Sequence, residues 1–269
     1  MHVERRARRV LLSLLCLTWM MPVACKRASE TPAEGARGAQ ADNPAPAPAQ
    51  ATSLPVQVLP GLEVISKPEE AAAALRREWP QTYTLMEGRL PQRKARELRR
   101  CTDIEGVDVN DVDVITQQET EVVQLQFLQC RVMKALTTAR PSRTSHVREL
   151  LTMKSPGEVL PAAMAPEFGE AAPDKAQERQ GKSWSATEPE LHFEPRTGER
   201  NAFSLEVTGR DTLGLLEWWA TGDFNGDGQE DVIAYRAMSP RGGSLTDIAA
   251  FVLTRSQPQG VLQILEHWR

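Results

Sequence analysis

The residues best suited to chemistry in this chain lie in the stretch ATGDFNGDGQEDVIAYR, residues 220–236. Four of them carry side-chain oxygens at closely spaced positions: Asp223, Asn225, Asp227 and Asp231. Counted from Asp223 they fill positions 1, 3, 5 and 9, a glycine stands at position 6, and the backbone carbonyl of Gln229 falls at position 7. Calcium binds carboxylate and carbonyl oxygens, and the glycine permits a sharp bend. The spacing therefore predicts a loop that holds Ca²⁺ as a structural cofactor.

A tight hairpin turn is the alternative explanation of the same residues. Either Asn225-Gly226 or Asp227-Gly228 suits the primed turn that joins two antiparallel strands, and the apolar run after the loop is typical of a strand. A turn of this kind needs only one such pair. It leaves Asp223 and Asp231 unexplained, so the pattern favours the metal.

The loop also resembles a known family of calcium sites. An EF-hand or dockerin loop needs an acidic residue at position 12 and a helix after it, whereas here Ala234 holds that position and VIAYR is strand-like. The stretch GDFNGDGQEDV resembles instead the calcium loop of FG-GAP repeats, as in integrin β-propellers. The resemblance implies side-chain oxygens from Asp223, Asn225, Asp227 and Asp231 and the backbone carbonyl of Gln229 as ligands. It occurs once in the chain, and a propeller needs several blades, so we expect the loop without the propeller.

The N-terminus has the layout of a secretory signal peptide. A basic segment with four arginines leads into the apolar run VLLSLLCLTWMMPVA, residues 10–24. A run of this length is short of the roughly 20 residues that span a bilayer as a helix. We therefore expect residues 1–24 to be a signal peptide rather than a transmembrane anchor.

The end of the apolar run resembles the lipobox of bacterial lipoproteins. Val23 and Ala24 precede Cys25, and in that family a cysteine after small residues receives a diacylglycerol and becomes the mature N-terminus. Pro22 stands where the family usually has leucine. The resemblance implies lipidation at Cys25 and a protein anchored to a membrane of the bacterial cell envelope. Because Lys26 rather than aspartate follows the cysteine, we expect the outer membrane rather than the inner one.

Residues 25–53 are rich in alanine, proline, glycine and polar residues, a composition that cannot bury a core. We expect this stretch to be a disordered, semi-rigid tether between the anchor and a globular domain spanning residues 54–269. Removing residues 1–24, with four arginines and one glutamate, changes the net charge from −4 to −7. A mildly acidic protein has no electrostatic reason to bind nucleic acid.

Two cysteines, Cys101 and Cys130, remain after the signal peptide and the lipidated residue are set aside. In an oxidising compartment such a pair is most simply a disulfide. Zinc would need four ligands, and neither cysteine has a second cysteine or a histidine at ligand spacing.

Helical signals dominate residues 54–168. Ser66 and Glu69 have the spacing of a capping box before an alanine-rich segment that Pro80 closes. Thr116 and Glu119 repeat that spacing before apolar residues at helical intervals up to Pro141. Between them, RLPQRKARELRRC (residues 89–101) is predicted to be a third helix, whose basic residues face either solvent or a membrane surface. A capped turn is predicted at residues 155–160, and a loop over residues 169–188.

From residue 191 the pattern changes to short β-rich runs separated by turn residues. We expect an antiparallel meander over residues 189–269 that carries the DxNxDGxxD loop. Helices followed by strands predict an α+β fold for the domain.

No nucleophile, zinc or phosphate-loop motif accompanies the histidines at positions 146, 192 and 267. Trp218 and Trp219 suggest a sugar-binding platform, but adjacent strand residues face opposite ways, so at most one can be exposed. We expect a non-catalytic, calcium-stabilised structural or binding module. A secreted hydrolase with an unrecognised site and a carbohydrate-binding protein are the alternatives.

Overall fold

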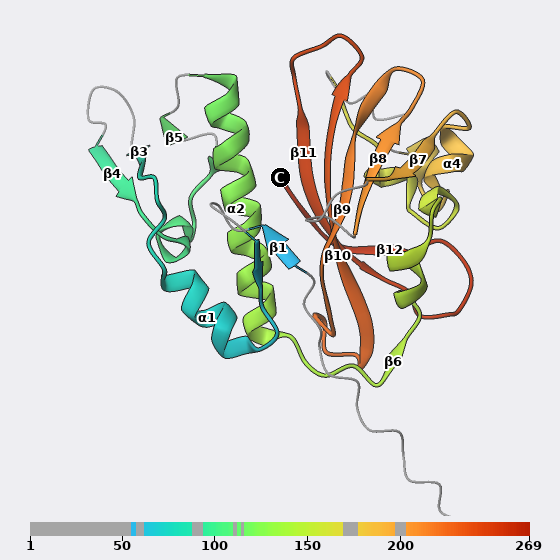
Figure 1. Cartoon of the computed structure of the whole chain (residues 1–269), viewed down its shortest axis with the longest axis horizontal. Coiled ribbons are helices and arrows are strands. Elements are labelled where there is room, and N and C mark those ends of the chain that lie inside the picture. Colours follow the sequence, from blue (N-terminus) through green and yellow to red (C-terminus); the bar gives the residue numbers. More distant parts are fainter. Residues whose placement is uncertain are drawn as a thin grey trace, which may run out of the picture. The chain divides into compact units, whose positions relative to one another are not determined.

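Six strands that follow one another along the chain form an antiparallel sheet (Figure 1). They are β7 (His192–Pro195), β8 (Ser204–Thr208), β9 (Thr212–Gly222), β10 (Gln229–Pro240), β11 (Asp247–Thr254) and β12 (Gln263–Trp268). Their order in the sheet is β12-β11-β10-β9-β8-β7, and β6 (Thr144–Ser145) pairs in parallel with β10. The predicted antiparallel meander is confirmed.

The structure is a computed structural model that describes residues 55–57, 62–87, 94–109, 112–113, 116–168, 177–196 and 203–269. All of them belong to the compact unit Ala45–Arg269. The predictions for the signal peptide, Cys25 and the tether lie outside the described residues.

Side-chain alternation along β10 explains why the sheet is covered on both faces. Val232, Ala234 and Met238 are buried in one hydrophobic cluster, the first core. Ile233 and Tyr235, between them in the sequence, are buried in another, the second core. Because every second residue of a strand faces the same side, a strand that is apolar at successive positions needs cover on both faces.

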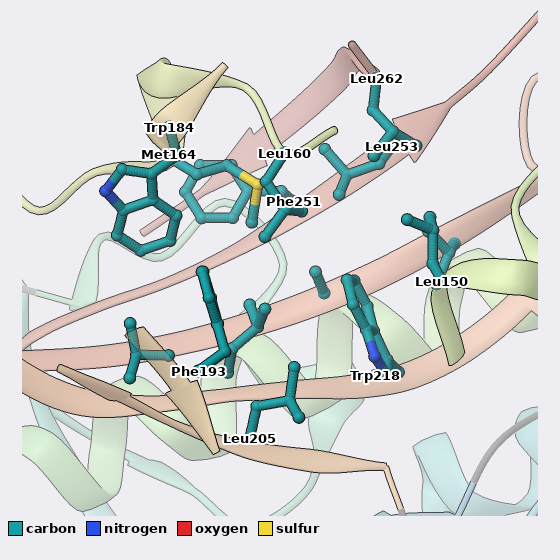
Figure 2. Packing of buried hydrophobic residues seen from close by; sticks show 14 of the residues in the cluster. Leu150, Leu160, Met164, Trp184, Phe193, Leu205, Trp218, Phe251, Leu253 and Leu262 are labelled. Atoms are coloured by element: carbon teal, nitrogen blue, oxygen red, sulfur yellow. The ribbon is translucent and has the colours of Figure 1, made fainter. Parts of the chain in front are cut away.

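Short helical segments supply the other side of the first core. They are η3 (Arg148–Thr152), η4 (Pro156–Glu158), η5 (Ala162–Met164) and α4 (Trp184–Thr187). Figure 2 shows Leu160, Met164 and Trp184 packed around Phe251 of β11. The turn predicted at residues 155–160 is thus present as η4, but Ser155 makes no side-chain cap. The loop predicted over residues 169–188 is wrong at α4, because the fully buried Trp184 anchors a helical turn there.

Two helices pack against the second core. The first, α1 (Pro68–Arg76), begins after Lys67, and Ser66 does not cap it as predicted. The backbone amide and hydroxyl of Ser66 donate to Glu70 rather than to Glu69, at 2.9 and 3.2 Å. The second helix, α2 (Gln117–Thr138), has the predicted capping box between Thr116 and Glu119. Alanines of α1 and Leu128, Val132 and Leu136 of α2 are buried in the second core.

Another face of α2 contacts a small sheet that the sequence did not suggest. This sheet has the order β4-β3-β5, from β3 (Tyr83–Glu87), β4 (Lys94–Leu98) and β5 (Val112–Asp113). Tyr83, Leu85, Leu98 and Val112 form the third core with Val123 and Phe127 of α2. A further pair of strands joins β1 (Pro55–Gln57) to β2 (Leu62–Val64).

The third helix predicted over residues 89–101 is wrong where the structure describes it. Lys94–Leu98 is strand β4, paired with β3, with four exposed residues and only Leu98 buried. Local composition favoured a helix, but pairing with β3 decided the conformation. Arg100 forms ion pairs with Glu78 and Asp103, so acidic neighbours neutralise part of the positive charge of this basic segment.

Cys101 and Cys130 form the predicted disulfide, with their Cα atoms 5.2 Å apart. It joins the short 3-10 helix η1 (Cys101–Ile104) to the middle of α2. No helix within the described part of the chain is both long and apolar enough to cross a membrane.

Candidate metal loop between β9 and β10

The oxygen-rich stretch forms the connection between the two longest strands of the sheet. β9 ends at Gly222 and β10 begins at Gln229, and Asp231 lies opposite Gly222 in the ladder. We call residues 223–231 the acidic loop. A two-residue primed turn at Asn225-Gly226 or Asp227-Gly228, the alternative considered from the sequence, is therefore not what joins these strands.

Asp223 organises the acidic loop from its first position. Its Oδ1 accepts a hydrogen bond from the amide of Gly226 at 2.7 Å, and its Oδ2 accepts one from the amide of Gly228 at 2.9 Å. The backbone curls around the carboxylate only because both glycines adopt positive φ angles, 81° and 87°. Residues with a Cβ rarely take that conformation, so the glycines of the motif are required by the shape of the loop.

Asn225 and Asp227 continue the same arrangement nearer the surface. The amide of Asp227 donates to Asn225 Oδ1 at 3.0 Å, and the amide of Gln229 donates to Asp227 Oδ1 at 2.7 Å. The Asn225 side-chain amide also donates to Asp227 Oδ2 at 3.0 Å. Side-chain oxygens thus accept hydrogen bonds from several backbone amides along the loop.

Asp231 is the buried member of the set. It is fully inaccessible to solvent, and its Oδ2 accepts a hydrogen bond from the amide of Phe224 at 3.0 Å. No donor lies in hydrogen-bonding geometry with its Oδ1, but the hydroxyl of Thr254 is close enough to the carboxyl to lower its pKa in part. Burial, with smaller contributions from Asp227 and Asp223, raises the pKa of Asp231 to about 6. A buried carboxylate with a free oxygen is costly unless a cation or a proton satisfies it.

The segment that follows α2 holds the acidic loop from one side. We call residues 139–147 the strap. Arg140 and Asp223 exchange backbone hydrogen bonds of 3.0 and 3.2 Å, and the carbonyl of Gly228 accepts from the amides of Arg143 and Thr144 at 2.7 and 3.3 Å. The loop therefore has a fixed neighbour that is distant in the sequence.

A charged residue pair secures the start of β10 next to the loop. Glu230 is fully buried, and Arg148 donates to it through Nε at 2.8 Å and Nη2 at 3.3 Å. Arg148 itself is half exposed, so the pair joins a buried carboxylate of β10 to a guanidinium at the surface.

Arg140 and Arg143 also reach the acidic loop with their side chains. Nη1 of Arg140 is 3.3 Å from the point where a Cβ on Gly226 would lie, and the Cδ and Nε atoms of Arg143 are 3.6 Å from the corresponding point on Gly228. Sequence analysis missed these two residues. They stand some 80 positions before the loop, and no local pattern connects them to it.

The donor set suits calcium, because every candidate ligand is an oxygen and the glycines allow the required curl. The free oxygen of Asp231 is the strongest sign of fit. However, within the described residues no three acidic, cysteine or histidine side chains converge closely enough to form a metal-binding group. The carboxylates of Asp223 and Asp227 are instead turned toward backbone amides. If calcium binds, it would be held by Asp223, Asn225, Asp227 and Asp231 with the carbonyl of Gln229.

The remaining sequence candidates do not gather into a second site. Trp218 and Trp219 face opposite sides of the sheet as expected, but both sides are covered and each residue is 2% exposed, so a sugar platform there is ruled out. His192 is on β7 and His267 on β12, at opposite edges of the sheet, and His146 is in the strap. The comparisons with family models, with curated proteins and with solved structures found no match.

Proposed function

We propose that this protein is a bacterial lipoprotein, held in the cell envelope by a lipid on Cys25, whose folded part is a calcium-stabilised structural or binding module rather than an enzyme. The anchor is inferred from the basic segment, the apolar run and the lipobox-like end of the signal peptide. The disulfide between Cys101 and Cys130 is consistent with export to an oxidising compartment.

One observation carries the calcium part of the proposal. Asp231 is fully buried with an unpartnered oxygen, at the inner end of a loop that has two further aspartates. In a loop that only connects two strands, a buried charge at that position would cost stability without any gain. Calcium would neutralise it and would also relieve the repulsion among the three carboxylates.

The test is a calorimetric calcium titration of the detergent-solubilised full chain, with a thermal melt in calcium and in chelator. We expect a dissociation constant of about 10⁻⁴ to 10⁻³ M, the range of extracellular calcium modules, and poor replacement by magnesium, which demands a smaller octahedral site. At a hundredfold excess over the dissociation constant, calcium stabilises the fold by about 2.7 kcal/mol.

Asp227→Ala should remove both the heat and the stabilisation. Asp211→Ala is the matched control, because Asp211 is an exposed aspartate in the turn before β9 and outside the loop. Absence of heat in the parent protein, with a melting curve indifferent to chelator, would show that the loop is only a connection.

A further inference from the structure

The acidic loop contains the only Asn-Gly pair of the chain, Asn225-Gly226, and its only Asp-Gly pair, Asp227-Gly228. Pairs of this kind form succinimides readily, because a glycine without a Cβ moves freely enough to bring its nitrogen to the preceding side chain. The curl of the loop requires glycine at both places, since φ is 81° at Gly226 and 87° at Gly228. The shape of the loop therefore creates two chemically labile positions.

The reaction at Asn225 is a ring closure that water then opens. The backbone nitrogen of Gly226 loses its proton to a base and attacks Cγ of Asn225. A bond forms between that nitrogen and Cγ, the bond between Cγ and Nδ2 breaks, and ammonia leaves with the proton returned. Water hydrolyses the succinimide to aspartate or to isoaspartate, in which the main chain runs through the side chain. Asp227 reacts in the same way with the nitrogen of Gly228, and water is then the leaving group.

A single carboxylate holds both attacking nitrogens. Oδ1 of Asp223 accepts a hydrogen bond from the amide of Gly226 at 2.7 Å, and its Oδ2 accepts one from the amide of Gly228 at 2.9 Å. Asp223 is buried, so water competes little for these oxygens. Each nitrogen must leave its hydrogen bond before it can attack, and it must lose a proton beside a negative charge that disfavours a second anion.

The two side chains open to attack are held as well. Oδ1 of Asn225 accepts from the amide of Asp227, and Nδ2 of Asn225 donates to Oδ2 of Asp227, both at 3.0 Å. Oδ1 of Asp227 accepts from the amide of Gln229 at 2.7 Å. These bonds restrict the rotation that would bring either Cγ onto the following glycine nitrogen.

We propose that Asp223 protects Asn225 and Asp227 from succinimide formation, and that these two residues are the sites at which the protein is modified when the loop opens. Asp223 is a positioning residue in this role, because it acts on both sites through the glycine nitrogens. Asn225 and Asp227 are exposed, so water can reach them for the hydrolysis step. The inference does not rest on the calcium site, since every contact that it uses is a hydrogen bond between residues of the loop.

Either product at Asn225 would disturb the loop. Aspartate there lacks the side-chain amide that donates to Asp227 and places a second carboxylate beside it. Isoaspartate lengthens the main chain between Asp223 and the two glycines, so their hydrogen bonds to its carboxylate no longer match. Modification would therefore keep the loop from closing again.

The test incubates the purified full chain in detergent and chelator at neutral pH. Peptide mass spectrometry follows the conversion of Asn225 to an acid and the appearance of isoaspartate at positions 225 and 227. The parent is measured folded and unfolded in guanidinium chloride, and the variant is Asp223→Ala. Asp211→Ala is the matched control, because it removes an exposed aspartate outside the loop. Near-ultraviolet circular dichroism establishes which variants remain folded.

A second measurement needs no substitution. Hydrogen exchange of the Gly226 and Gly228 amides in the folded parent reports directly on their bonds to Asp223. Gly242 is the matched reference, because it also has a positive φ and lies in an exposed turn, the one between β10 and β11.

We expect Asn225 to react about ten- to a hundredfold more slowly in the folded parent than in the unfolded parent, because a hydrogen bond to a charged acceptor must break first. In folded Asp223→Ala both sites should react at rates close to those of the unfolded chain. Asp211→Ala should keep the rates of the parent. The amides of Gly226 and Gly228 should exchange more slowly than that of Gly242.

Equal rates in the folded and unfolded parent would overturn the inference. So would a folded Asp223→Ala protein that reacts as slowly as the parent. If this variant does not fold, amide exchange decides, and exchange at Gly226 and Gly228 as fast as at Gly242 would refute the protection. Because all of these measurements are made in chelator, their outcome is separate from that of the calcium titration.

Discussion

Asp223 and Asp231 belong to one loop but differ in how far hydrogen bonds stabilise their carboxylates. Asp223 satisfies both of its oxygens with the amides of Gly226 and Gly228, so its charge is stabilised by the backbone alone. Asp231 accepts one amide and is fully buried, with its second oxygen unpartnered. Burying the ionised carboxylate of Asp231 therefore costs free energy of folding, and this cost can be measured.

Replacing Asp231 by asparagine removes that cost and the calcium response together. Burial raises the pKa of Asp231 from its ordinary 3.8 to about 6, which corresponds to a penalty on the order of 3 kcal/mol for holding the ionised form at neutral pH. We expect Asp231→Asn to be more stable than the parent in chelator, and calcium to stabilise it no further. Urea unfolding in chelator and in calcium measures both effects. A destabilised variant in chelator would contradict the assigned cost.

His267 gives the fold a pH dependence. Its ring stacks on Phe251 at a centroid distance of 4.5 Å, and partial desolvation of this solvent-exposed residue, followed by the charges of Arg269 and Arg236, lowers its pKa below the ordinary 6.5. At this residue the unfolded chain binds more protons than the native chain just below pH 6.5, so the contribution of His267 to stability falls as the pH falls through that window. His267→Gln should show a smaller loss.

The measurement is the unfolding free energy of both proteins at about pH 7.5 and about pH 5, in chelator. The lost stacking on Phe251 lowers the stability of the variant at both pH values, so only the difference in pH dependence reports on the imidazole. Equal pH dependence in the two proteins would rule out His267 as a contributor.

At the scale of elements, α2 is the helix on which two cores depend. Leu128, Val132 and Leu136 face the large sheet, whereas Val123 and Phe127 face the sheet β4-β3-β5. The strap continues from its C-terminal end to the acidic loop. Loosening α2 would therefore affect both sheets.

The disulfide covalently links α2 to the segment that connects β4 and β5 of the small sheet. The Cys101–Cys130 bond closes a loop with a sequence separation of 29 residues, worth roughly 3.5 kcal/mol on the chain-entropy account. Cys101→Ser with Cys130→Ser should lower the unfolding free energy by about that amount, measured by urea unfolding of the purified protein. Mass spectrometry of unreduced peptides is the accompanying check, and two free thiols in natively exported protein would contradict the bond.

At the scale of the whole molecule, the folded unit and the proposed anchor serve different purposes. The unit Ala45–Arg269 contains all three cores and the acidic loop, and the large sheet joins two of those cores through its opposite faces. Its attachment to the membrane is expected to depend on one residue outside that unit.

Cys25→Ala should release the protein from the membrane fraction. Without the cysteine no diacylglycerol can be added, and a single missing anchor leaves no other expected attachment to the bilayer. Fractionation followed by immunoblotting measures the distribution, and Cys16→Ala is the control, because Cys16 is within the predicted signal peptide. Retention of the Cys25 variant in the membrane fraction would refute lipidation there.

The sequence by itself determined the features that depend on neighbouring residues. The capping box at Thr116 and Glu119 predicted the start of α2, because both partners lie within one turn. Short β-rich runs separated by turn residues predicted the meander after residue 191, because each run and each turn can be recognised locally. The glycine at position 228 indicated a sharp bend in the loop, and its positive φ angle agrees.

Tertiary structure decided what depends on residues far apart in the chain. Lys94–Leu98 looked helical but became a strand when paired with Tyr83–Glu87. Trp218 and Trp219 are both buried because helices cover one face of the sheet and short helical turns the other. Arg140 and Arg143 reached the acidic loop only through the fold of the strap. Local spacing reports which residues can meet within a turn or a strand, whereas these contacts arise from the packing of whole elements.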